Sequence, residues 1–265
     1  MHFTRYLALG DSISIDLYPA LDYAGEDGWV NEARLRRGLG AASLLYRNDD
    51  EAWPEFRGRD LATRYPGIRF HNGHDLGAPA DGETDNLTSD GATTEDVRAY
   101  QLPRVAPSEE PTLVTLTVGG NDMLQVLYRD PPPRNLVAGM ASRLRRILRD
   151  IKARRPNSLV LVTNVYDPSD GTNQLGDGQR LDEPARWLAD YNLQLRVAAA
   201  DTDGALLADI HGPFLGHGLT APPDERWYWR GSIIEPGARG ASEVRRVWWD
   251  CLDATRNTYS VLRNT

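Results

Sequence analysis

The chain has 265 residues, of which 40% are hydrophobic and 26% charged, which fits one globular domain whose core needs neither disulfides nor a structural metal. The formal net charge of −8 disfavours nucleic acid or an anionic membrane as partner, and the single cysteine, Cys251, excludes an intramolecular disulfide. We see no signal-peptide pattern and no apolar run long enough to span a bilayer. We therefore expect a cytoplasmic, single-domain protein over residues 1–265, with its oligomeric state left open.

Short apolar runs rich in Val, Leu, Ile and Thr predict five strands. In chain order these are Tyr6–Leu9, Gly67–His71, Thr112–Val118, Leu159–Val165 and Ala205–Ile210.

Helical apolar periods fall between or after the later strands. One stripe runs from Leu136 to Ile151 and stops before Pro156, and its Arg-rich end is interpreted as a solvated helix face. A second helix begins at Asp182, which is the predicted N-cap. A third stripe, Val244–Leu252, places Cys251 on a buried face as a small core residue.

This alternation of strands and helices predicts an α/β fold, a parallel sheet with helices on both faces. In such sheets ligands bind beyond the carboxyl ends of the strands, so polar residues directly after strands are the best site candidates. Two stretches, Asp22–Arg64 and Asn72–Asp85, are interpreted as insertions that rim the site.

The first candidate motif, Gly10-Asp11-Ser12, follows the first strand. A serine placed there points its Oγ into the crevice as a nucleophile, with its own N–H facing an oxyanion. Taken alone, the motif is equally a turn followed by a helix N-cap.

Two further motifs supply candidate oxyanion donors. Gly91, within Ser89-Asp90-Gly91-Ala92, lets the backbone approach a ligand with its N–H exposed, although a glycine turn before a helix explains the motif as well. Asn121, within Gly119-Gly120-Asn121-Asp122, carries an amide that can donate to an oxyanion, or it caps the next helix.

In this order, each after a strand, the three motifs resemble those of the SGNH/GDSL hydrolase family of esterases and lipases. The resemblance covers Tyr6 to about Asp253. It implies a three-layer, flavodoxin-like, five-stranded sheet of order 2-1-3-4-5. It also implies Ser12 as nucleophile and an oxyanion hole from Ser12 N–H, Gly91 N–H and Asn121. We expect an ester or acylated small molecule as substrate and no cofactor.

The last family motif, an Asp followed two residues later by His-Pro, is altered here. Ser232 stands at the position of the Asp and Glu235 at that of the catalytic His, while Pro236 is retained. An ordinary Glu, with a pKa of ~4.3 against ~6.5 for His, is a weaker base.

Three hypotheses follow. Glu235 is itself the base, with its pKa raised by burial near the aromatic segment Trp227–Trp229. Alternatively His211 or His217, which follow the fifth strand, is the base and Glu235 orients it. In the third hypothesis the chain has lost efficient catalysis and binds an acyl or sugar ligand.

Other site types have less support. His71, His74 and Asp75 form a compact polar group that is better explained as a loop than as a metal site, and the acidic run at 81–86 lacks a calcium-loop pattern. No phosphate-binding loop occurs, so a flavin protein of the same fold is the weaker rival.

The substrate is not fixed by the sequence. Aromatic residues of the first insertion and of the segment before Glu235 either line an aromatic pocket or pack a lid. They are Tyr23, Trp29, Tyr46, Trp53, Trp227 and Trp229.

Overall fold

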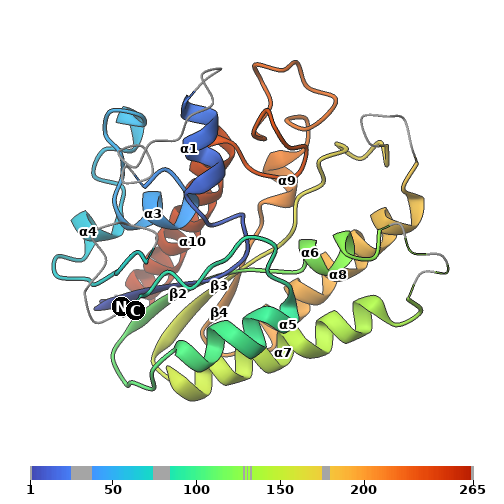
Figure 1. The fold of residues 1–265 in the computed structure, drawn as a ribbon. Helices are drawn as coiled ribbons and strands as arrows, with labels where there is room; N and C mark the ends of the chain where they lie inside the picture. The colour runs from blue at the N-terminus through green and yellow to red at the C-terminus, as the bar shows by residue number, and fades with distance from the viewer. Residues whose placement is uncertain are drawn as a thin grey trace.

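A computed structural model describes residues 2–24, 38–73, 84–127, 129, 131, 133–174 and 180–263. Its centre is a parallel sheet of four strands in the order β1-β2-β3-β4. The strands are β1 (Arg5–Gly10), β2 (Thr112–Thr117), β3 (Ser158–Thr163) and β4 (Ala205–Ala208). The α/β class predicted from the sequence is confirmed (Figure 1). β2 and β4 lie within the predicted runs, β3 begins one residue earlier, and β1 extends its run by one residue at each end.

The predicted second strand at Gly67–His71 is wrong as a continuous strand, so the sheet has four strands and not five. The chain reaches the free edge of β1 at two isolated bridges, Arg5 with Arg69 and Ala8 with Asn86. The predicted Asn72–Asp85 insertion lies between these two bridges in the sequence, and its residues 74–83 are outside the described part of the chain. The segment still lies on the β1 edge that the order 2-1-3-4-5 requires.

Helices cover both faces of the sheet, as Figure 1 shows with α7 and α8 on one face and α10 on the other. Alternate strand residues point to opposite faces, so Tyr6 and Ala8 pack in one core cluster while Leu7 and Leu9 pack in the other. The helical segments are α1 (Leu17–Ala24), α3 (Ala41–Tyr46), η2 (Pro54–Phe56), α4 (Leu61–Arg64), α5 (Thr94–Asp96), η3 (Val97–Gln101), η4 (Leu102–Arg104), α6 (Gly120–Leu124), α7 (Leu136–Arg154), α8 (Asp182–Ala200), α9 (His211–Phe214) and α10 (Ala238–Arg263).

Three helix predictions need correction or refinement. Asp182 is the first residue of α8 and Leu181 is the N-cap, because the Asp182 carboxylate accepts hydrogen bonds from Arg180 instead of capping the helix. The Arg-rich end of α7 is not wholly solvated, since Arg155 is only 2% exposed. Cys251 is partly buried against the core, with its thiol directed at the Leu207 carbonyl.

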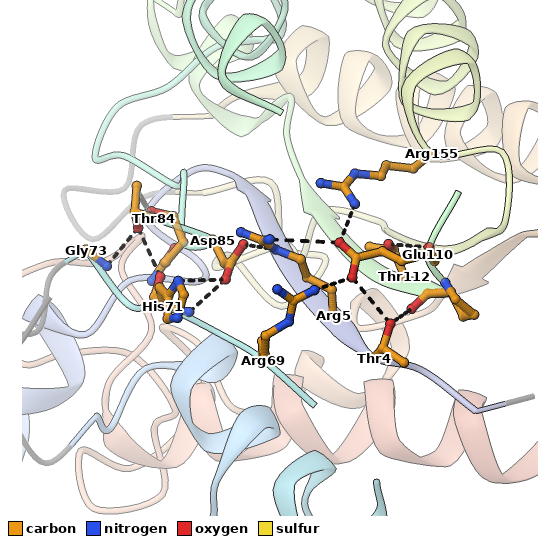
Figure 2. A network of polar contacts seen from close by, with 12 residues as sticks. Thr4, Arg5, Arg69, His71, Gly73, Thr84, Asp85, Glu110, Thr112 and Arg155 are labelled. Atoms are coloured by element: carbon orange, nitrogen blue, oxygen red, sulfur yellow. Dashed lines mark hydrogen bonds and ion pairs between the residues drawn. The ribbon is translucent and has the colours of Figure 1, made fainter. Parts of the chain in front are cut away.

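The buried Arg155 belongs to a charge network at the amino ends of the strands (Figure 2). The Glu110 carboxylate lies between Arg155, at 2.8 Å, and Arg69, with Arg5 beyond. The Arg5 guanidinium also contacts the buried Asp85 carboxylate at 2.6 Å. Because Glu110 precedes β2 and Arg155 precedes β3, the network joins neighbouring strands at the edge opposite the carboxyl ends.

We predict that Glu110→Ala lowers the free energy of unfolding by about 3 kcal/mol, because it leaves the buried Arg155 guanidinium without its carboxylate. Urea unfolding followed by tryptophan fluorescence measures this change. The exposed neighbour Glu109 is the matched control, and Glu109→Ala should change the stability by no more than about 0.5 kcal/mol. Equal stabilities for the two variants would contradict the role of the network.

Candidate active site

The loops that follow β1 and β2 meet the segment before α10 at one cavity of about 660 Å³. Ser12, Asn121 and Glu235 all line this cavity. Most of the other lining side chains are apolar: Ile13, Met123, Leu124, Leu127, Val165, Tyr166, Pro168, Leu181, Pro184, Ala185, Leu188, Ile233 and Ile234. The polar remainder of the wall comes from Asp11, Asp167, Ser169, Asn173, Arg230 and Ser232. Ser12, Asn121 and Glu235, which lie far apart in the sequence, are therefore brought together in a mainly apolar cavity.

Ser12 is placed by a turn directly after β1. Gly10 has a φ of +123°, and a Cβ on it would lie 1.8 Å from the Thr117 carbonyl oxygen, so only glycine fits between β1 and β2. The next residue, Asp11, donates its N–H to the Thr117 carbonyl at 3.1 Å, and its carboxylate accepts the Ile13 N–H at 3.2 Å. Ser12, only 5% exposed, is thus held at the carboxyl edge of the sheet.

Asn121 lies in the first turn of α6, which begins after Gly119 at the end of β2. Its side-chain Nδ2 donates to the Ala92 carbonyl at 3.1 Å and so joins the loop that carries Gly91. Since an amide Nδ2 has two hydrogens, this bond leaves a second donor.

Gly91 has a φ of +71° and is exposed. It lies next to Ala92 but outside the lining of the cavity. The structure therefore brings Ser12 and Asn121 together at the cavity and places Gly91 beside them in the adjoining loop.

Glu235 is buried with 8% of its surface exposed, and its Oε2 has no close hydrogen-bond partner in the described part of the chain. Burial raises the pKa of its carboxyl to about 7, and the Asp90 and Asp11 carboxylates add to the increase. The nearby Ser12 side chain acts in the opposite direction and lowers this pKa. A carboxylate that accepts a proton near neutral pH therefore lies against the candidate nucleophile.

A short hairpin holds Glu235 in this position. The Trp229 N–H donates to the Glu235 carbonyl at 2.8 Å, and the Gly237 N–H donates to the Trp227 carbonyl at 2.9 Å. Ser232, at the position of the family's Asp, accepts the Glu235 N–H with its Oγ at 3.3 Å and so shapes the turn. Its role here is structural, because its hydroxyl binds backbone rather than a base.

The hairpin is also fastened to the start of α10. The Asp22 carboxylate, from α1, accepts the Ala238 N–H at 2.9 Å at the first residue of that helix. The predicted insertion Asp22–Arg64 therefore contributes directly to the position of Glu235.

The family model for GDSL-like lipase/acylhydrolases matches residues 8–241. The chain belongs to this family. It is a hydrolase whose fold is that of other members, although no curated protein matches its sequence.

Solved structures of similar fold include lipases and esterases. An extracellular lipase from Streptomyces rimosus is 21% identical with a TM-score of 0.55, over 92% of this chain and 98% of the lipase. Phospholipase A1 from Streptomyces albidoflavus is also 21% identical, with a TM-score of 0.54 over 93% and 98%. An acetylxylan esterase from Geobacillus stearothermophilus is 17% identical, with a TM-score of 0.55 over 93% of both chains. At these identities the likeness shows the fold alone.

Neither candidate histidine of this GDSL-like hydrolase lines the cavity with Ser12. His211 is the first residue of α9, and its Nδ1 lies 3.0 Å from the Val165 carbonyl. The His217 ring stacks on Trp227 at 3.8 Å, and its Nδ1 lies 3.1 Å from the Glu225 carbonyl. Both imidazoles are engaged in loop packing.

The aromatic residues singled out in the sequence also lie elsewhere. Tyr23, Tyr46, Trp53, Trp227 and Trp229 are absent from the cavity lining, and Trp29 lies outside the described residues. The sequence does not reveal this mainly apolar wall, because apolar residues of a helix are the usual sign of a core-facing side. Leu188 of α8 is such a residue, yet it lines the cavity.

Within the described residues, no group of His, Cys, Asp or Glu is arranged to hold a metal ion, and His74 and Asp75 lie outside them. In the same residues no helix has the length and apolar character that crossing a membrane requires.

We predict that two substitutions move the pKa of Glu235 in opposite directions. Ser12→Ala removes the nearby hydroxyl that favours the carboxylate and should raise the pKa above about 7. Asp90→Asn removes a nearby negative charge and should lower it. Carbon-13 NMR of the labelled carboxyl measures both shifts against the wild-type protein. Shifts of the same sign in the two variants would contradict the opposing effects of Ser12 and Asp90 on the pKa of Glu235.

Proposed function

We propose that the protein hydrolyses carboxylic esters with an aliphatic acyl group, with Ser12 as nucleophile and Glu235 as its general base. The observation that carries this proposal is the buried Glu235 carboxylate against Ser12, at the sequence position of the family's histidine.

The reaction has two steps in which Glu235 acts on successive nucleophiles. In the first, the carboxylate accepts the Ser12 proton while Oγ bonds to the ester carbonyl carbon, and the alcohol then leaves with the proton from Glu235. In the second, water loses a proton to Glu235 and attacks the acyl-enzyme, and Ser12 leaves with that proton as the acid is released. The Ser12 N–H, the Gly91 N–H and the Asn121 amide are the proposed donors to the oxyanion.

The raised pKa makes this route chemically reasonable. A Glu carboxyl at its ordinary pKa of 4.5 is a poor acceptor for a serine proton, whereas at about 7 its basicity approaches that of an imidazole, whose ordinary pKa is ~6.5. Close to pH 7 about half of the molecules then carry the ionised base. The apolar wall of the cavity supplies the desolvation that produces this shift.

The placement of the histidines favours Glu235 over a Ser–His–Glu arrangement. The Nδ1 atoms of His211 and His217 both lie close to backbone carbonyls, and neither residue lines the cavity. A purely ligand-binding role has no need for a base beside Ser12, and it becomes the better explanation if substitution of Ser12 leaves turnover unchanged.

The lining of the cavity favours an aliphatic acyl chain. From Ser12 the wall continues along Met123 and Leu124 of α6 to Ala185 and Leu188 of α8. A space of about 660 Å³ lies within the range of pockets that bury whole small-molecule ligands, and it greatly exceeds what an acetyl group fills. Burial of each additional methylene contributes about 0.8 kcal/mol to binding.

We predict that Glu235→Gln lowers kcat for a p-nitrophenyl ester by about 10²- to 10⁴-fold, because the amide cannot accept the serine proton. In the wild-type protein kcat/KM should rise with pH and level off above an apparent pKa of about 7, since only the ionised carboxylate is a base. Initial rates between about pH 5 and 9 measure both effects.

The controls separate the competing bases. Glu225→Gln changes an exposed carboxyl outside the cavity lining and should leave kcat unaltered, as should His211→Ala and His217→Ala. Loss of turnover in either histidine variant would show that this histidine, and not Glu235, is the base. Full turnover in Ser12→Ala would contradict the proposed hydrolytic function itself.

For chain length, we predict that kcat/KM is higher for octanoate than for acetate esters of p-nitrophenol, and that Leu188→Phe reduces this preference by filling the cavity. The matched control is Leu193→Phe on the same helix, at a position that is 54% exposed and outside the cavity lining. A flat or acetate-weighted profile in the wild-type protein would contradict the aliphatic acyl site.

A further inference from the structure

The end of β1, two residues before Ser12, is held by the side-chain amide of Gln101. The Gly10 N–H donates to Gln101 Oε1 at 2.7 Å, and Gln101 Nε2 donates to the Gly10 carbonyl at 2.8 Å. Gln101 is only 3% exposed, so both bonds are made away from solvent. One side chain therefore fixes both hydrogen-bonding groups of the glycine that starts the Ser12 turn.

This amide completes a backbone ladder that the chain itself leaves unfinished. Along the free edge of β1, Ala8 N–H donates to Asp85, Leu87 N–H donates to Ala8, and Ser89 N–H donates to Gly10. In a regular parallel ladder the Gly10 N–H would pair with the carbonyl of residue 87. Gln101 Oε1 takes the place of that acceptor at the point where the neighbouring segment leaves the sheet.

Gln101 reaches this position from the segment that follows Gly91. It is the last residue of η3, a π-helical turn, and such turns recur at functional sites. Upstream, Thr93 and Asp96 form a capping box that fixes the start of α5. Gln101 Nε2 also lies 3.4 Å from Ser89 Oγ, at the beginning of the Gly91 loop. The same amide thus contacts the Ser12 turn and the Gly91 loop.

We propose that Gln101 is a positioning residue that sets the Ser12 nucleophile in register with the Gly91 N–H. This inference rests on the proposed function, in which both groups serve one reaction. Gly10 cannot shift towards β2, because a group the size of Cβ already has no room beside the Thr117 carbonyl. The Gln101 amide restrains Gly10 on its other side, and the restraint is transmitted through Asp11 to Ser12.

The test compares two substitutions of similar size. Gln101→Met fills the space but can neither accept the Gly10 N–H nor donate to its carbonyl. Gln101→Glu can do both while the introduced carboxyl is protonated, and it loses the donor when that carboxyl ionises. Tyr100→Ala, at a 70% exposed position of the same turn, is the matched control.

We expect Gln101→Met to lower kcat by about 10²-fold with KM changed less than about threefold, measured well below the melting temperature, because small displacements of a nucleophile have effects of this size. For Gln101→Glu, the ratio of its kcat to the wild-type kcat should fall as pH rises. If Gln101 serves stability alone, its substitution lowers the melting temperature but leaves kcat per folded molecule unchanged. The ratio of the Gln101→Glu kcat to the wild-type kcat then stays constant across pH.

Hydrogen exchange supplies a readout that is independent of turnover. Amides in residues 7–14 and 87–92 should exchange faster in Gln101→Met than in Tyr100→Ala. Wild-type kcat or unchanged exchange in Gln101→Met overturns the proposal. If Ser12→Ala, assayed alongside, keeps full turnover, the hydrolytic function fails, and the exchange result still decides whether Gln101 orders the two loops.

Discussion

Burial of the Glu235 carboxyl against Ser12 is the constraint on which the site depends. Several parts of the chain serve it: the hairpin that ends at Gly237, the Ser232 turn, and the Asp22 carboxylate that holds the start of α10. The same carboxyl lines a mainly apolar cavity to which α6 and α8 contribute. The insertion, the hairpin and the cavity are thus linked to one chemical property, a carboxyl with a pKa of about 7.

The same desolvation opposes folding. Because the pKa of Glu235 is raised from 4.5 to about 7 in the folded state, its contribution is fully present below pH 4.5 and is lost as pH rises through about 7. The ionised form, which the proposed mechanism requires, is therefore the less stable one, by about 3 kcal/mol for a shift of this size. The charge network around Glu110 lies at the opposite edge of the sheet. Its ion pairs stabilise the fold and can offset the cost of burying Glu235.

Elements that depend on the local sequence pattern were predicted correctly. Those that depend on tertiary contacts were not. The strong apolar runs became β2 and β3, whereas Gly67–His71 did not form a strand because the chain meets β1 only at Arg69 and again near Asn86. Ser12 and Asn121 were predicted because each directly follows a strand. The neighbour of Ser12 was left open between Glu235 and two histidines, since that contact depends on how the 227–237 hairpin folds back.

An aliphatic pocket and a carboxylate base are physically coupled. An acyl chain that fills the cavity removes further water from Glu235, which favours its protonated form and so works against the base. The nearby Ser12 hydroxyl works in the other direction, because it favours the carboxylate and lowers its pKa. In the proposed mechanism, the position of the Ser12 turn therefore affects the base as well as the nucleophile. The proposed positioning role of Gln101, through its two hydrogen bonds to Gly10, then matters twice. A displaced Ser12 would be misaligned for attack and would no longer help to keep Glu235 ionised in the occupied site.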